Sequence, residues 1–98
     1  MSEVAKEGGA QGRFVVVNAN GMHARAATKL VKLASDYPCK IMLSGPEEDA
    51  VSAKSVMGVL LLCGAKGSVI DVQANGERAQ EAVDAIGALI ADGFGEGT

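Results

Sequence analysis

Two kinds of apolar periodicity alternate along this 98-residue chain, and they limit its fold class more than any other feature. Segments 13–18, 39–43, 50–53 and 69–74 are short, and in the clearest of them apolar residues occupy every second position, as in a strand with one buried face. Segments 24–36 and 77–93 instead repeat apolar residues three and four positions apart, which is typical of helices packed on one side. Segment 55–63 opens with a serine suited to N-capping and is followed by glycines, which favours a short third helix, although periodicity alone would also allow a strand there. The sequence therefore predicts the order β-α-β-β-α-β-α.

Strands with one apolar face need a cover, and helices with one apolar stripe can supply it. We therefore predict an α+β two-layer sandwich with a mainly antiparallel sheet. The length suits one domain with one core. Segment 1–12 is polar and rich in small residues, so we expect a flexible N-terminal tail there and the folded domain over 13–98.

The composition excludes several classes of protein. A formal net charge of −3 argues against a nucleic-acid binder, which would carry a basic surplus. No apolar run approaches the length of about 20 residues that spans a membrane, and the N-terminus has no secretory pattern, so we expect a cytoplasmic protein without membrane insertion. Cys39 and Cys63 lie in apolar surroundings without the spacing of a metal clip or a redox pair, which predicts buried, reduced thiols.

The single histidine, His23, lies where a glycine-containing turn meets the helix predicted over 24–36. Free N–H groups in a first helical turn and the positive end of the helix dipole attract anions. Arg25 adds a guanidinium suited to phosphate or carboxylate. The same positive potential favours the neutral imidazole, which is the nucleophilic form. His23 is therefore a candidate to capture a phosphoryl group.

His23 could also have a structural role, or a role in another kind of active site. A histidine at a helix start is often a capping or solvated residue. A hydrolase finds little support, because no nucleophile elbow or other catalytic motif accompanies His23. A metal site would need distant carboxylates or the two cysteines, at no recognisable ligand spacing. We therefore expect neither a metal nor a cofactor.

The second unusual segment is the apolar helix predicted to begin at Ser55, whose hydroxyl suits an N-cap. It holds more apolar side chains than one face of a two-turn helix can bury: Val56, Met57, Val59, Leu60, Leu61 and Leu62. Unless the helix is wrapped on most sides, some of them are exposed. An exposed aliphatic and methionine patch is typical of a protein-binding surface.

Together, "GMHARAA", "AKSVMGVLLL", "AKG" and the terminal "GFGE" closely resemble the HPr family, the histidine-containing phosphocarrier proteins of the bacterial phosphoenolpyruvate:sugar phosphotransferase system. The resemblance runs from about Arg13 to Glu96, with its two main motifs in the right order and at the right separation. It implies an open-faced β-sandwich, in which three helices cover one face of a four-stranded antiparallel sheet. It also implies a phosphocarrier that depends on partner enzymes and is not itself an enzyme.

The resemblance assigns roles to individual residues. His23 would carry the phosphoryl group on its δ1 nitrogen, taking it from phosphorylated enzyme I and passing it to enzyme IIA domains, with help from Arg25. Ser55 matches the regulatory serine that HPr kinase/phosphorylase modifies with ATP. Five residues would form the partner-binding surface of a monomer: Val56, Met57, Leu60, Ala26 and Lys29.

Ala26 stands where the family usually has proline after His-Ala-Arg. Alanine leaves one more N–H available and a slightly looser first turn, so we expect an altered transfer rate and not a loss of function. Two alternatives stay open: a member of the nitrogen-related NPr branch, or a regulatory protein that binds a kinase or transcription factor according to the phosphorylation of Ser55. A module that binds a small metabolite ranks below both, because the sequence shows no pocket-forming residues.

Overall fold

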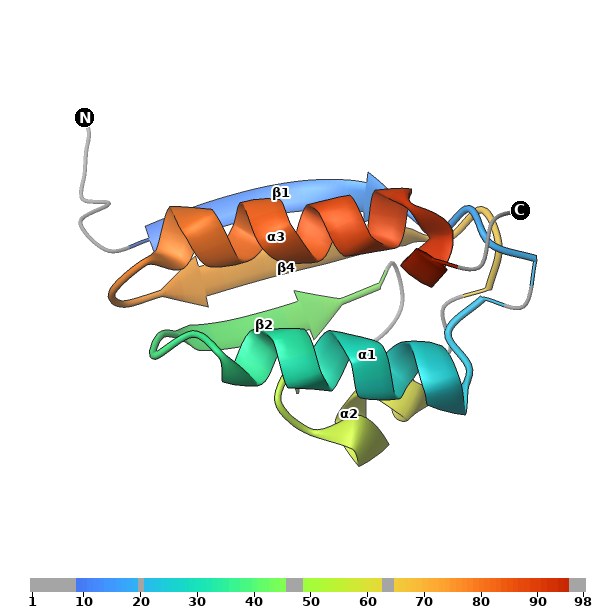
Figure 1. Cartoon of the computed structure of the whole chain (residues 1–98), viewed down its shortest axis with the longest axis horizontal. Helices are drawn as coiled ribbons and strands as arrows, with labels where there is room; N and C mark the ends of the chain where they lie inside the picture. The colour runs from blue at the N-terminus through green and yellow to red at the C-terminus, as the bar shows by residue number, and fades with distance from the viewer. Residues whose placement is uncertain (1–8, 20, 46–48, 63–64, 96–98) are drawn as a thin grey trace.

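One antiparallel sheet, with strand order β1-β4-β2-β3, forms the base of the molecule (Figure 1). The computed structural model describes residues 9–19, 21–45, 49–62 and 65–95. Its strands are β1 (Gly9–Val15), β2 (Lys40–Ser44), β3 (Val51–Ser52) and β4 (Val69–Asn75). The last strand in the sequence is therefore inserted between the first two, where it pairs with β1 along its whole length and with β2 on its other side.

The helices cover one face of this sheet. They are α1 (Ala24–Ser35), α2 (Val56–Leu61) and α3 (Ala79–Ala91), followed by a 3₁₀ turn, η1 (Gly93–Gly95). The helix α3 packs on β1 and β4, α1 packs beside α3, and α2 packs against α1 (Figure 1). The opposite face of the sheet stays open, with Val15 48% and Val69 40% exposed. The predicted α+β fold, the element order and the open-faced sandwich are confirmed.

Alternation along the strands separates the two faces as predicted. In β4, Ile70, Val72 and Ala74 are buried, and the residues between them face the open side. In β2, Ile41 and Leu43 are buried in the same way, and Cys39 just before the strand is buried and free. Cys63 lies outside the described residues.

The start of β1 differs from the sequence prediction. The strand was expected over 13–18, but it begins at Gly9 and ends at Val15, so residues 9–12 pair with β4 and do not belong to a tail. Strand pairing uses backbone groups, and the small and polar side chains of 9–12 show no apolar alternation that would reveal it. Residues 1–8 of the predicted tail lie outside the described residues.

The largest buried side chain, Phe94, lies in the turn η1, whereas the partly buried ring of Phe14 packs at the centre of the β1–α3 contact. Two glycines make room for the Phe14 ring. A β-carbon at Gly87 would lie 2.2 Å from ring atoms, and one at Gly12 would lie 2.8 Å from them. Because Gly87 is buried within α3, the helix gives up intrinsic stability at this position to approach the sheet closely.

We predict that Gly87→Ala lowers the free energy of unfolding by about 1 kcal/mol. The helix gains about 1 kcal/mol from alanine, but the clash with Phe14 costs on the order of 1–3 kcal/mol. Urea denaturation measures the difference.

The matched control is the same substitution in a Phe14→Ala background. Without the Phe14 ring there is no clash, and only the higher helix propensity of alanine remains. Gly87→Ala is therefore expected to raise the free energy of unfolding in that background. A stabilising effect in the wild-type background would contradict the packing argument.

Candidate functional site

His23 is the N-cap of α1, in an extended backbone conformation (φ −99°, ψ −179°). Its Nδ1 accepts a hydrogen bond from the backbone N–H of Arg25 at 3.2 Å. A nitrogen that accepts a hydrogen bond presents a lone pair, so the proton of the neutral ring lies on Nε2. The capping role considered for His23 is therefore present in the structure. The same contact directs the Nδ1 lone pair toward the anion-attracting end of α1.

A tight turn before α1 sets the direction in which His23 enters the helix. The backbone N–H of Gly21 donates to Asn18 O at 3.1 Å, and the N–H of His23 donates to Gly21 O at 3.1 Å. Gly21 has a φ of +62°, which glycine adopts without strain. Asn18, which the sequence analysis did not single out, is buried beneath this turn with its side chain bonded to Gly21 O.

Several cations occupy the exposed side of α1. Arg25 lies exposed in the first turn, and Lys29 and Lys32 follow along the helix, which contains no acidic residue. The Lys29 Nζ donates to Phe94 O at 2.6 Å, so this lysine also ties α1 to the turn η1. The first turns of α1 therefore combine a helix N-terminus with positive side chains, an arrangement that favours anions.

Ser55 caps α2, and apolar side chains of that helix reach solvent. The Ser55 Oγ accepts the N–H of Gly58 at 3.0 Å, as expected for an N-cap serine. We define the α2 patch by its exposed apolar residues: Met57 (68% exposed), Leu61 (63%) and Val56 (38%). The expectation that this helix exposes part of its apolar surface is confirmed.

Two members of the predicted partner surface are placed differently. Ala26 is fully buried, so its side chain is not exposed for a partner to contact, and its part in the partner surface stays a prediction. It precedes Leu30 by one helical turn and shares the buried face of α1. Leu60 is half-buried against the core, whereas Leu61 is exposed and was left out of the predicted surface. The spacing of four between Met57 and Leu61 places them on one helical face and could have indicated this.

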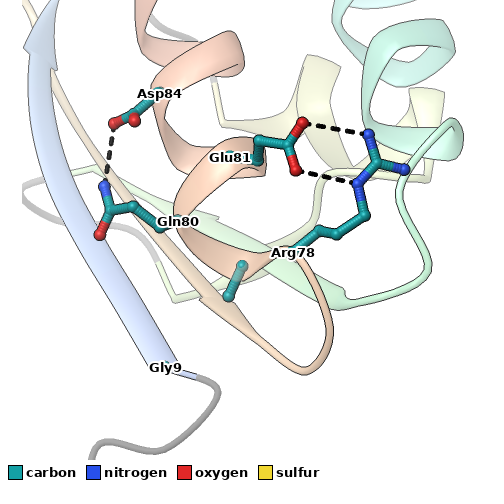
Figure 2. A pocket seen from close by; sticks show the side chains of 6 residues that line it. Gly9, Arg78, Gln80, Glu81 and Asp84 are labelled. Atoms are coloured by element: carbon teal, nitrogen blue, oxygen red, sulfur yellow. Dashed lines mark hydrogen bonds and ion pairs between the residues drawn. The ribbon is translucent and has the colours of Figure 1, made fainter.

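A pocket of about 460 Å³ lies at the start of α3, beside Gly9 and thus at the opposite end of β1 from His23 (Figure 2). Its charged groups pair with one another: Arg78 donates to both carboxylate oxygens of Glu81 at 3.0 and 3.3 Å, and Gln80 donates to Asp84 at 2.9 Å. The hydrogen bond from Arg78, together with its charge, lowers the pKa of Glu81. A carboxylate with a lowered pKa stabilises the folded state at pH values above its unfolded pKa, and this stabilisation is lost as the pH falls through its folded pKa. Because both side chains of the pair are largely exposed, the effect is small.

The described residues contain neither a cluster of metal-ligating side chains nor a membrane-spanning helix. Across 9–19, 21–45, 49–62 and 65–95, no three histidine, cysteine, aspartate or glutamate side chains gather as metal ligands would. Over the same ranges, none of the helices has the length and apolar character that crossing a membrane requires.

The comparisons with known proteins agree on one family. The model for the HPr component phosphorylation site of the phosphotransferase system matches residues 10–92. The chain is 43% identical to the phosphocarrier protein HPr of Cupriavidus necator, over 84% of this chain and 91% of that protein. It is 41% identical to the phosphocarrier protein NPr of Klebsiella oxytoca, over 83% of this chain and 90% of that protein.

A solved structure of HPr from Thermoanaerobacter tengcongensis superimposes with a TM-score of 0.85 at 32% identity, covering 91% of this chain and 99% of that one. Sequence and structure therefore agree over nearly the whole described part of the chain. On this evidence, the protein belongs to the HPr family of phosphocarrier proteins of the phosphotransferase system.

Proposed function

We propose that this phosphocarrier takes a phosphoryl group from phosphorylated enzyme I onto His23 and passes it to enzyme IIA domains. The observation that carries the proposal is the lone pair of His23 Nδ1 at the N-terminus of α1. In the transfer, Nδ1 forms a bond to phosphorus while the bond between phosphorus and the donor group of enzyme I breaks. The imidazole proton stays on Nε2 throughout.

The surroundings of Nδ1 suit the charge that arrives with the phosphoryl group. The Arg25 N–H that now donates to Nδ1 becomes free to donate to a phosphoryl oxygen once Nδ1 is bonded to phosphorus. The dipole of α1 and the Arg25 guanidinium add attraction without any rearrangement of the fold. Onward transfer to enzyme IIA breaks the bond between Nδ1 and phosphorus and restores the hydrogen bond from the Arg25 N–H to Nδ1.

We predict that wild-type protein incubated with enzyme I and phosphoenolpyruvate gains one acid-labile phosphate per chain. The informative variant is His23→Asn, because asparagine is a good N-cap and keeps α1 intact while removing the nucleophile. Mass spectrometry at neutral pH is expected to show no gain for this variant. Phosphate on His23→Asn would place the acceptor elsewhere and overturn the assignment.

The α2 patch, together with the cations of α1, suggests the chemistry of the partner surface. The helix α2, which exposes the patch, packs against α1, which carries Arg25, Lys29 and Lys32, and this combination fits a partner that offers aliphatic contacts bordered by acidic side chains. That the monomer is the working unit stays a prediction. The cytoplasmic location stays a prediction.

We predict that Met57→Ala and Leu61→Ala each raise the KM for transfer from enzyme I by about five- to tenfold and leave kcat nearly unchanged. Loss of a partly buried apolar contact costs on the order of 1 kcal/mol. The matched control is Val69→Ala, because Val69 is an exposed valine on the open face of the sheet. An equal rise in KM for Val69→Ala would show that the α2 patch has no special role.

We also propose that phosphorylation of Ser55 by an HPr kinase/phosphorylase regulates docking. A phosphate at the N-cap of α2 is compatible with the fold, since the positive end of a helix tolerates added negative charge. The same charge lies next to Val56 and Met57 and would repel an acidic partner. Regulation would therefore act on recognition and not on folding.

Two substitutions at Ser55 separate charge from capping. Aspartate and asparagine are both good N-caps of nearly equal size, and only aspartate adds charge. We predict that Ser55→Asp slows transfer from enzyme I several-fold while Ser55→Asn stays near the wild-type rate. Equal slowing by both variants would contradict regulation by charge. Acid-stable phosphate formed with ATP and the kinase, absent from Ser55→Asn, tests the modification itself.

A further inference from the structure

Asn18 is the one residue in the described part of the chain that is both polar and buried, with an exposed fraction of 0%. It lies three residues past the end of β1, beneath the turn that leads to His23. Burial of an amide is unfavourable unless it is hydrogen-bonded, and an apolar or small residue would fill this position at lower cost. A buried amide here therefore points to a need for directional bonding.

Two hydrogen bonds join Asn18 to Gly21. The side-chain Nδ2 donates to Gly21 O at 2.8 Å, and the backbone oxygen of Asn18 accepts the N–H of Gly21 at 3.1 Å. Gly21 O also accepts the backbone N–H of His23 at 3.1 Å. The carbonyl oxygen of Gly21 thus accepts two hydrogen bonds, one from the buried side-chain amide of Asn18 and one from the backbone N–H of His23.

Asn18 is itself held by parts of the chain that are distant in sequence. A β-carbon built on Gly93 would lie 3.4 Å from the Asn18 β-carbon, so the C-terminal turn η1 packs directly against this residue. On the β1 side, Val16 exchanges backbone hydrogen bonds with Ser68 and Gly67 at 2.9 and 2.7 Å. The amide therefore has little freedom to move, and the position of the Gly21 carbonyl follows from it.

We propose that Asn18 is a positioning residue for phosphoryl transfer at His23. The Asn18 amide holds the Gly21 carbonyl in place, and this carbonyl holds the backbone of His23. As a result, the Nδ1 of His23 stays hydrogen-bonded to the Arg25 N–H, with its lone pair oriented to attack phosphorus. The inference rests on the proposed function for the transfer step. Its structural part, the control of the His23 ring, can be observed without any phosphoryl transfer.

The test compares Asn18→Asp with Val83→Ala. Aspartate keeps the size of asparagine but removes the donor to Gly21 O, whereas Val83→Ala weakens a buried part of α3 away from His23. Asn18→Ser, which keeps a hydroxyl donor, serves as a milder second variant if aspartate prevents folding. Urea denaturation first establishes that each variant is folded and how much stability it has lost.

The first readout is the pair of imidazole ¹⁵N chemical shifts of unphosphorylated His23, which report whether the neutral ring carries its proton on Nε2 or on Nδ1. Wild type and Val83→Ala are expected to show a ring protonated on Nε2. Asn18→Asp is expected to show a mixture of the two tautomers, and Asn18→Ser a smaller change in the same direction. Unchanged shifts in both Asn18 variants would overturn the proposal.

The second readout is the rate of transfer from phosphorylated enzyme I. A displacement of about 1 Å at a reacting atom can cost about 100-fold in rate, so we expect a loss on the order of tenfold or more for Asn18→Asp. Val83→Ala is expected to keep the wild-type rate under conditions where it is folded. A loss that tracks stability equally in both variants would assign Asn18 a structural role only. Failure of the wild-type protein to accept phosphate would instead overturn the proposed function.

Discussion

The pairing of β4 between β1 and β2 is the constraint on which the rest of the structure depends. It joins the last strand to the first, so the sheet can form only when segments about sixty residues apart have met. The alternation of β4 then defines one apolar face, on which α3 packs with α1 beside it. The end of β1 leads directly into the turn that carries His23, so the position of the site follows from the sheet.

At the candidate site, one histidine caps a helix and is the proposed phosphoryl acceptor. The Nδ1 lone pair of His23 caps α1, and the same lone pair is the nucleophile in the proposed transfer. The two uses are compatible because the N–H that is released when Nδ1 reacts can bond to the incoming phosphoryl oxygen. A short helix terminus thus supplies orientation, a donor and positive potential without a metal or a catalytic dyad in the proposed mechanism.

Charge is distributed unevenly over the molecule. The chain carries a formal net charge of −3, yet α1 contains cations and no acidic residue, whereas Glu81 and Asp84 lie on α3. The α2 patch packs next to α1 and so borders the positive region. Net charge alone would suggest a mildly acidic protein, but the helix that begins at His23 is positive and packs against a helix with exposed apolar side chains.

Periodicity and capping residues together predicted the fold class, the order of the elements, the buried faces of β2 and β4, and the caps of α1 and α2, because each can be inferred from residues close together in the sequence. The motif around His23 likewise indicated the family without a structure. Three features were decided by tertiary structure alone: the pairing of residues 9–12, the burial of Ala26 and the amide of Asn18 beneath the His23 turn. Each depends on a partner supplied by a distant segment, β4 for the first strand, the core for Ala26, and η1 for Asn18. Local side-chain patterns do not reveal such contacts, because backbone pairing and burial depend on which distant segments of the chain pack against a residue.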